Sequence, residues 1–197
     1  MVVLKRLHDA IKDGDTIYGV VRGIGSSSDG RGKGITAPSQ RGQVQAIARA
    51  YQQAQYEPSS VELVEAHGTS TKVGDATELS TLSTLWKGFE KGNHVAVGSI
   101  KSQIGHLKAA AGIAGIIKAT MALHNSVIPP SAGFETPNPT VDWDNIPFYV
   151  PTQSQTWPKP AANPRRAGVS AFGFGGTNFH IALEQFDSGY HTVVAND

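Results

Sequence analysis

Residues 167–183 read AGVSAFGFGGTNFHIAL, and this stretch decides how the last third of the chain folds. Apolar and β-branched residues occupy 167–172 and 178–183, and the run GFGG lies between them at 173–176. Glycine adopts positive φ without the steric cost that other residues meet. The pattern therefore predicts two strands joined by a bend in which two or more residues have positive φ.

Upstream of this strand pair, the apolar residues change repeatedly between helical and strand periods. In chain order the pattern predicts a helix over 44–54, a strand at 61–66, a helix that Asp75 caps, a strand at 95–98 and a helix over about 107–124. The last helix is rich in Ala and Gly, so another backbone can approach it closely and it should lie in a domain interior. Alternating strands and helices predict an α/β fold with helices packed on a sheet.

The two ends and one long connector have weaker patterns. Residues 2–8 and 17–24 are β-rich and flank an Asp-Gly pair, which predicts a hairpin. Gly and Ser dominate 25–39, which predicts a loop, and nine of the eleven prolines fall in 127–166, which predicts an extended connector. The tail at 187–197 should be weakly structured.

Composition excludes several classes of function. The 197 residues include 17 Lys+Arg, 16 Asp+Glu and no cysteine. Balanced charge argues against a net basic field that binds nucleic acid, and the lack of Cys excludes disulfides, Cys-ligated metals and a thiol nucleophile in this chain. Lys5 and Arg6 interrupt the N-terminus too early for a secretory signal, and the apolar window 109–123 carries Lys118 and is shorter than the roughly 20 residues that span a bilayer. We expect a cytoplasmic protein without a membrane partner.

Three polar or Gly-rich turns lie after or between predicted strands, at 67–75, 101–106 and 172–178. Ligands gather outside the carboxyl ends of strands in α/β sheets. A single loop histidine is usually structural, but His67 and His106 occupy the same topological position. Neutral imidazole donates to a developing oxyanion or exchanges protons near neutrality. The histidines show no metal-ligand spacing, so we expect no metal site, and we interpret four as structural or surface residues: His8, His94, His124 and His191.

Together the three turns resemble the signatures of the C-terminal half of a β-ketoacyl synthase. They read VEAHGTSTKVGD at 64–75, GSIKSQIGH at 98–106 and VSAFGFGGTNFH at 169–180, in the family's order and spacing. The resemblance covers about residues 1–186. The runs SSSDGRGK at 26–33 and FGFGGTNFH at 172–180 are most similar to iterative polyketide and polyunsaturated fatty acid synthases.

This resemblance implies a thiolase-like fold, in which two similar α/β halves give five layers in the order αβαβα. The chain would supply the C-terminal half. Residues 1–39 would be the closing strands of the first half and a Gly/Ser-rich loop, residues 40–186 the second half, and residues 187–197 a tail.

The family reaction is a decarboxylative Claisen condensation in polyketide or fatty acid biosynthesis. By resemblance, His67 and His106 stabilise the enolate left when a malonyl thioester loses CO2, and Lys101 helps to fix the second histidine and the local charge. Phe174 and Gly175 belong to the gating and oxyanion loop. The resemblance also implies that Thr69 and Thr71 line the pantetheine tunnel and that Asn178 braces the glycine-rich loop.

The family's nucleophile cysteine lies in the first half, and this chain has no cysteine. The leading interpretation is the C-terminal portion of a ketosynthase, as a fragment or one chain of a split enzyme, and it should expose an apolar face and a sheet edge. Two alternatives stay open: a malonyl-thioester decarboxylase that needs no thiol, and a non-catalytic module that docks on a carrier protein or another thiolase-fold subunit.

The expected partners follow from the same resemblance. They are an acyl carrier protein and a Cys-bearing N-terminal half, with a homodimer as a further option because family members commonly dimerise through the first half. No bound cofactor is expected. The substrates would arrive on the phosphopantetheine of the carrier protein or on CoA.

Overall fold

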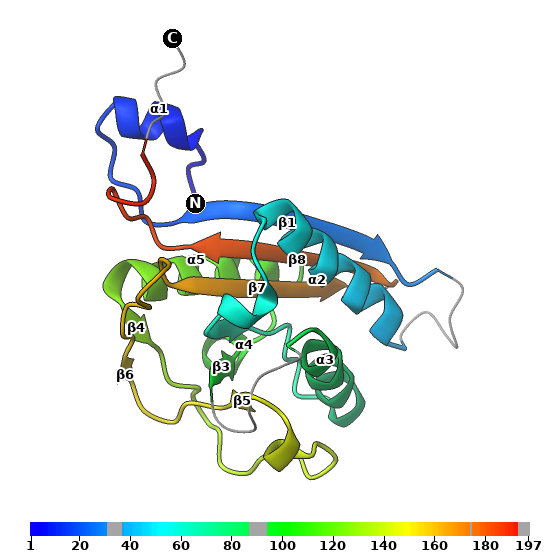
Figure 1. Ribbon diagram of the computed structural model, residues 1–197. Coiled ribbons are helices and arrows are strands. Elements are labelled where there is room, and N and C mark those ends of the chain that lie inside the picture. Colours follow the sequence, from blue (N-terminus) through cyan, green and yellow to red (C-terminus); the bar gives the residue numbers. More distant parts are fainter. Residues whose placement is uncertain (31–36, 87–93, 174, 193–197) are drawn as a thin grey trace.

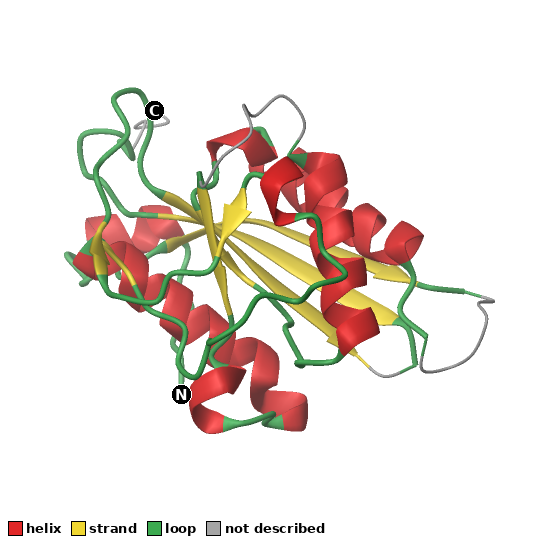
Figure 2. Cartoon of the chain, turned by 90° about the horizontal axis from the view of Figure 1, so that it is seen from below, coloured by secondary structure: helices red, strands yellow, loops and turns green. Residues whose placement is uncertain are grey.

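Six strands form one mixed sheet at the centre of the molecule, and helices lie on both of its faces (Figures 1 and 2). The computed structural model describes residues 1–30, 37–86, 94–173 and 175–192. The strand order is β1-β8-β7-β2-β3-β5. Its members are β1 (Val20–Ser28), β2 (Leu63–Glu65), β3 (Val95–Gly98), β5 (Phe148–Tyr149), β7 (Arg166–Gly173) and β8 (Thr177–Glu184). The expected α/β fold is confirmed.

The direction of the strands changes across the sheet. β2 runs parallel to both β3 and β7, and β3 runs parallel to β5. β8 pairs antiparallel with β7 on one side and with β1 on the other. β1 therefore shares one sheet with the elements after residue 39, and residues 20–28 belong to the same structural unit as the later strands.

Within the described ranges, α-helices and a few short segments complete the fold. The helices are α1 (Leu7–Lys12), α2 (Gln40–Ala54), α3 (Lys72–Leu85), α4 (Lys101–Ile104) and α5 (Ala111–Asn125). The 3-10 turns η1 (Pro58–Ser60), η2 (Lys108–Ala110) and η3 (Trp143–Asn145) lie between them, and β4 (Val127–Ile128) pairs with β6 (Gln155–Thr156). The proline-rich connector at 127–166 has few regular elements, as expected. Among the helices of the described residues, none is long and apolar enough to cross a bilayer.

Two apolar cores lie on opposite faces of the sheet. One includes Tyr51, Trp86 and Phe148. The other includes Leu123 and Trp157. α2 and α5 cover opposite faces (Figure 1). Burial of large side chains on both faces stabilises the sheet by about 25 cal/mol for each Å² of apolar surface removed from water. The sheet is thus a rigid platform for the loops at its strand ends.

The predicted N-terminal hairpin is wrong. The Asp13-Gly14 pair ends helix α1, where Gly14 has a φ of 70° and its N–H donates to the carbonyl of Ile11. Val3 and Leu4 are exposed and belong to no strand in the structure. An apolar run needs a neighbouring strand to pair with, and residues 1–5 have none among the described residues.

The predicted loop at 25–39 is also wrong over 25–28, which continue strand β1. Gly23 and Gly25 pack directly on α2: a Cβ at Gly25 would lie 1.9 Å from the carbonyl oxygen of Ala46. These glycines allow close helix–strand packing instead of forming a turn. Residues 31–36 of the predicted loop lie outside the described residues.

Three details of the later elements also differ from the prediction. Thr71, not Asp75, caps α3, because its Oγ1 accepts the N–H of Gly74. Residues 101–104 form the short helix α4 instead of a turn, and α5 begins at Ala111, after a 3-10 turn. α5 also has one exposed face, so it is not wholly interior.

The end of the chain is better anchored than the predicted weakly structured tail, as far as residue 192. His191 is buried, and its Nε2 lies 3.0 Å from Oε2 of the fully buried Glu184. Arg22 and Arg166 also donate to this carboxylate. The network ties the described part of the tail to β1, β7 and β8.

Candidate functional site

The two histidines predicted from the sequence lie together at the carboxyl ends of neighbouring parallel strands. His67 follows β2, and His106 follows β3 and α4. Their ring centroids are 5.6 Å apart and the rings meet edge to face at 83°. The ring of His67 also contacts Phe172 at the end of β7, at 5.9 Å. The parallel sheet therefore brings together two turns that are 39 residues apart.

Hydrogen bonds determine how the first histidine turn is held. The backbone N–H groups of His67 and Gly68 donate to the two carboxylate oxygens of Glu78, at 2.8 and 2.9 Å. Glu78 lies on α3 and is buried, and burial raises its pKa to about 7. The sequence reasoning missed Glu78. A lone carboxylate next to the apolar Leu79 and Leu82 was the available signal, because a charged residue on a buried helix face needs a polar partner.

The two rings differ in how their nitrogens are used. His106 is exposed, and its Nδ1 accepts the backbone N–H of Lys108 at 3.0 Å. The network thus places the proton of neutral His106 on Nε2, which can donate. His67 Nδ1 is buried and has no hydrogen-bond partner among the described residues. A buried ring nitrogen without a partner is uncommon in folded proteins, and functional sites are one place where it occurs.

His67 is held in its neutral form. Burial, followed by the nearby positive charge of Lys101 and by His106, lowers the pKa of His67 to about 4. Lys101 opens α4 and is half-buried, and burial lowers its own pKa while Glu65 and Glu78 oppose that change. Lys101 thus affects the charge of His67. A neutral imidazole close to a cation suits stabilisation of an anion.

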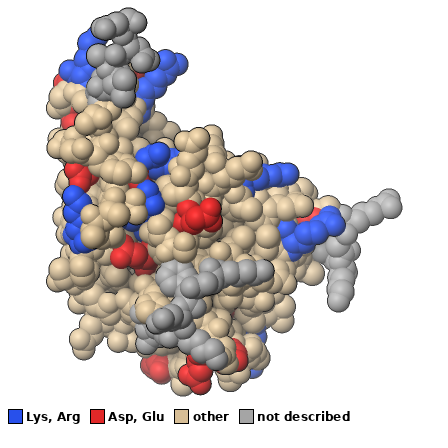
Figure 3. Space-filling view, in the orientation of Figure 1, with Lys and Arg blue, Asp and Glu red and all other residues tan. Residues whose placement is uncertain are grey.

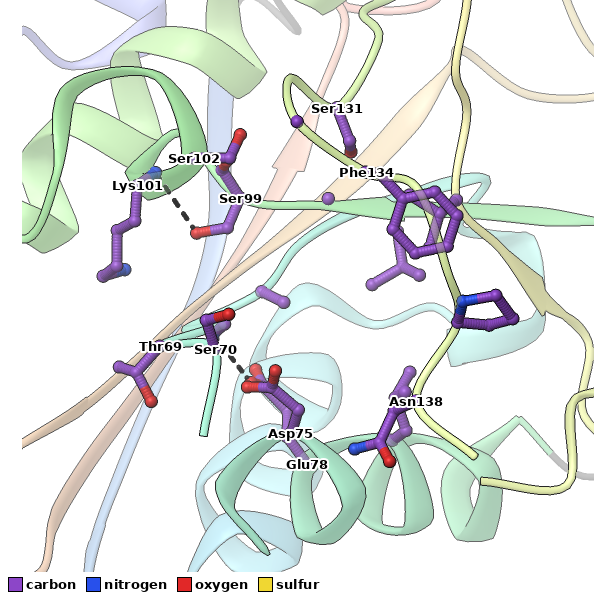
Figure 4. Close-up of a pocket in the computed structure, with 18 of the residues that line it drawn as sticks. Thr69, Ser70, Asp75, Glu78, Ser99, Lys101, Ser102, Ser131, Phe134 and Asn138 are labelled. Carbon is purple, nitrogen blue, oxygen red and sulfur yellow. Dashed lines mark hydrogen bonds between the residues drawn. The ribbon is translucent and has the colours of Figure 1, made fainter. Parts of the chain in front are cut away.

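A cavity of about 840 Å³ opens beside the histidine turns. Thr69, Lys101 and His106 line one part of it, and the proline-rich segment around Phe134 and Asn138 lines another (Figure 4). Two buried oxygens of its lining residues, Asp75 Oδ1 and Ser131 Oγ, have no partner among the described residues. The cavity is polar at the histidine turns and can accept a polar chain.

The remaining predicted residues belong either to the first histidine turn or to the glycine-rich loop between β7 and β8. Thr69 Oγ1 and Thr71 Oγ1 are 3.4 Å apart, and Thr71 serves as the helix cap, while Thr69 lines the cavity. Gly175 lies in the β7–β8 loop with a φ of 92°, which confirms the predicted positive φ. Phe174 lies outside the described residues.

Asn178 is buried at the base of the glycine-rich loop. Its Nδ2 donates to Asp29 Oδ1 at 2.7 Å, and the backbone N–H of Asp29 donates to the carbonyl of Gly176 at 2.7 Å. These bonds connect the start of β8 to the end of β1. This geometry supports the predicted bracing role.

Comparisons with known proteins agree with this fold and site. The structure is thiolase-like: it superposes on the ketosynthase from module 6 of the bacillaene synthase of Bacillus subtilis 168 with a TM-score of 0.88 at 42% identity, covering 93% of this chain and 34% of that chain. The family model for the β-ketoacyl synthase C-terminal domain matches residues 18–135, and the ketoacyl-synthetase C-terminal extension matches residues 137–193. The chain belongs to the β-ketoacyl synthase family and carries its C-terminal domain.

The similar curated proteins are large synthases. A polyunsaturated fatty acid synthase polypeptide of Thraustochytrium sp. is 50% identical over 193 residues, which cover 94% of this chain and 7% of that protein. A phenolphthiocerol/phthiocerol polyketide synthase polypeptide of Mycobacterium tuberculosis is 49% identical over 185 residues, covering 94% of this chain and 12% of that protein. The predicted similarity to polyketide and polyunsaturated fatty acid synthases is confirmed, and the chain spans a small part of these relatives.

Proposed function

We propose that this chain supplies the malonyl-activating half of a ketosynthase active site, and that a Cys-bearing N-terminal half supplies the acyl-enzyme. The observation that carries the proposal is the edge-to-face pair of His67 and His106, whose ring centroids are 5.6 Å apart. The pair lies beside a large cavity. His67 is neutral at pH 7, and the proton of neutral His106 lies on Nε2.

The chemistry proceeds in two steps. In the first, the bond between the malonyl carboxylate and C2 breaks, CO2 leaves, and its electron pair forms an enolate whose oxygen accepts hydrogen bonds from the two imidazoles. In the second, C2 attacks the carbonyl of the acyl thioester on the cysteine, a carbon–carbon bond forms and the thiolate leaves. Fixed donors that face a developing oxyanion in a site shielded from water lower the barrier by about 3–4 kcal/mol each.

The substrate arm belongs to the same proposal. A phosphopantetheine chain from an acyl carrier protein, or CoA, would enter the cavity along Thr69 and the segment around Phe134. Lysines and arginines are interspersed with acidic residues on the face shown in Figure 3. That distribution does not resemble a single basic field for a polyanion.

The exposed apolar surface supports a partner half. On α5 the side chains of Ile113, Ile117 and Met121 recur every four residues and are 37–42% exposed. Ile24 on β1 and Phe179 on β8 are also exposed and alternate with residues that face α2, so they lie on the sheet face that α5 covers in part. Several large apolar side chains exposed on one side of a sheet are typical of an interaction site. The N-terminal half of the ketosynthase is the proposed occupant.

Reconstitution tests the proposal and separates the alternatives. This chain is joined to a Cys-bearing N-terminal ketosynthase half, and CO2 release and β-ketoacyl product are measured from malonyl and acyl thioesters. We expect both signals from the joined enzyme. CO2 release by the chain alone at the same rate would favour the thiol-free decarboxylase, and carrier-protein binding without any turnover would favour the docking module.

A further inference from the structure

A largely buried ion pair next to the histidine turns is unused by the proposed chemistry. Lys118 Nζ lies 2.7 Å from Glu65 Oε2, and the two side chains are 12% and 3% exposed. Removing two charges from water costs several kcal/mol per ion, and apolar replacements of similar volume are often neutral or stabilising. A contribution to folding stability therefore does not explain why this ion pair is present.

The carboxylate of Glu65 uses both of its oxygens. Oε2 accepts Lys118 Nζ, and Oε1 accepts the backbone N–H of Ile100 at 2.6 Å. Glu65 is the last residue of β2, two residues before His67, and Ile100 directly precedes Lys101 and α4. One side chain thus links the two turns that carry the site.

The same carboxylate also contacts α5, which begins five residues after His106. Gly115 and Lys118 are three residues apart and so lie on one face of the helix. A Cβ at Gly115 would lie 3.0 Å from Glu65 Cγ and 3.2 Å from Val169 Cγ1. The absence of a side chain at Gly115 lets the helix approach closely enough for Lys118 to reach Glu65.

We propose that Glu65 and Lys118 are positioning residues of this site: their buried ion pair holds the end of β2, the start of α4 and the helix α5 in one arrangement, and thereby sets how His67, Lys101 and His106 face the substrate. This assignment rests on the proposed function. Neither residue touches the substrate in it.

The charges of the pair also reach the site. Burial is the largest influence on the pKa of Lys101 and lowers it. Glu65 raises this pKa, and Lys118 lowers it. Burial raises the pKa of Glu65 itself, and Lys118 is the largest opposing influence. Loss of one partner would change the charge next to Lys101 as well as the geometry.

The test uses the complete ketosynthase, with this chain joined to its Cys-bearing half, and measures kcat and KM for CO2 release from a malonyl thioester. The main variant is the double substitution Glu65→Leu with Lys118→Met, which leaves no unpaired buried charge. We expect its kcat to fall about tenfold to a hundredfold, as for a misplaced site, while KM changes less than about twofold. A double variant with wild-type kcat would overturn the inference.

A second variant covers the case in which the double variant does not fold. Glu65→Asp keeps the charge but is one methylene shorter, so it cannot reach both Lys118 and Ile100. Its kcat should also fall, and a wild-type kcat would overturn the inference. Lys118→Met alone should lose both folding stability and kcat, because it leaves a buried carboxylate unpaired.

Glu62→Gln is the matched control. Glu62 is a half-buried carboxylate that directly precedes β2, but its Oε2 accepts Trp157 Nε1 at 2.8 Å, away from the histidine turns. The kcat of Glu62→Gln should stay at the wild-type value. If its kcat fell as far as that of the Glu65 variants, the loss would reflect general disturbance of the fold and the inference would be overturned. A wild-type enzyme without CO2 release would overturn the proposed function itself, whereas an active wild type with active Glu65 variants overturns only the positioning role.

Discussion

His67 and His180 both lie at the sheet and both have a lowered pKa, but their ring nitrogens differ. His180 is fully buried, with Nδ1 3.0 Å from Ser170 Oγ and Nε2 3.0 Å from Tyr51 Oη. His67 Nδ1 has no partner among the described residues, and its ring faces His106. Burial alone lowers the pKa of His180 to about 3, whereas at His67 burial is the largest cause of the lowered pKa and Lys101 and His106 add to it. A lowered pKa is therefore common to both histidines, and the unpaired ring nitrogen together with the neighbouring His106 distinguishes His67 from the fully paired His180.

The largest expected effect is the loss of the second imidazole of the site. In the complete ketosynthase, His106→Ala should lower kcat for CO2 release about 100-fold to 1,000-fold, because under the proposed function it removes one donor to the enolate oxygen. Folding should be retained, since His106 is exposed. Steady-state CO2 assays with His8→Ala as the exposed-histidine control test this. Equal rates of CO2 release for the two variants would show that His106 takes no part in the reaction.

The next largest effect is expected from a packing change at Gly25, which pairs with His180 across β1 and β8. Gly25→Ala should lower the free energy of unfolding by about 3 kcal/mol, at the upper end for overpacking, because the new Cβ meets backbone atoms of α2 that cannot rotate away. Urea unfolding measures this. Gly14→Ala is the control without nearby atoms, although its φ of 70° adds backbone strain of about 1 kcal/mol. A Gly25→Ala variant as stable as wild type would contradict the described packing.

A smaller loss is expected from unpairing the structural histidine. Tyr51→Phe removes the hydroxyl that pairs with His180 Nε2 and should lower the free energy of unfolding by about 1–3 kcal/mol. The kcat of folded enzyme should not change. Urea unfolding and CO2 release on the same preparation check both parts. A large fall in kcat without a loss of stability would contradict the structural role assigned to Tyr51 and His180.

The smallest expected effect is on the pH dependence of stability. The pKa of His180 is about 3 in the fold against 6.5 as the ordinary value, so the unfolded state binds this proton first. His180 therefore costs no stability above pH 6.5 and lowers stability as the pH falls toward 3, by at most about 1.4 kcal/mol per pH unit. Between pH 7 and 5, wild type should lose more stability than His180→Gln. Equal slopes would show that His180 is not held neutral.

The sequence predicts the parts of the site that local chemistry determines. The strand ends at His67 and His106 follow from apolar periodicity, and the positive φ of Gly175 follows from the glycine run. The Glu65–Lys118 pair joins residues 53 positions apart, and the Arg22–Glu184 pair joins residues 162 positions apart, so no local pattern reveals them. Lys118 was visible as a single charge in an apolar helix, but its partner was not.

The wrong predictions have the same cause. Gly25 has the composition of a loop residue, but α2 packs on it, and Asp13-Gly14 has the composition of a hairpin turn, but it ends a helix. In both cases a neighbouring element, or the absence of one, decided between two structures that the local sequence allows equally. Tertiary packing therefore overrides local preference at these positions.

A crystal structure of the complete ketosynthase with a malonyl thioester analogue that cannot lose CO2 tests the central claim most directly. The account predicts that the thioester oxygen lies within hydrogen-bond distance, about 3.2 Å or less, of ring nitrogens of both His67 and His106. An analogue bound with its thioester oxygen on other groups, and with both imidazoles facing solvent, would contradict it.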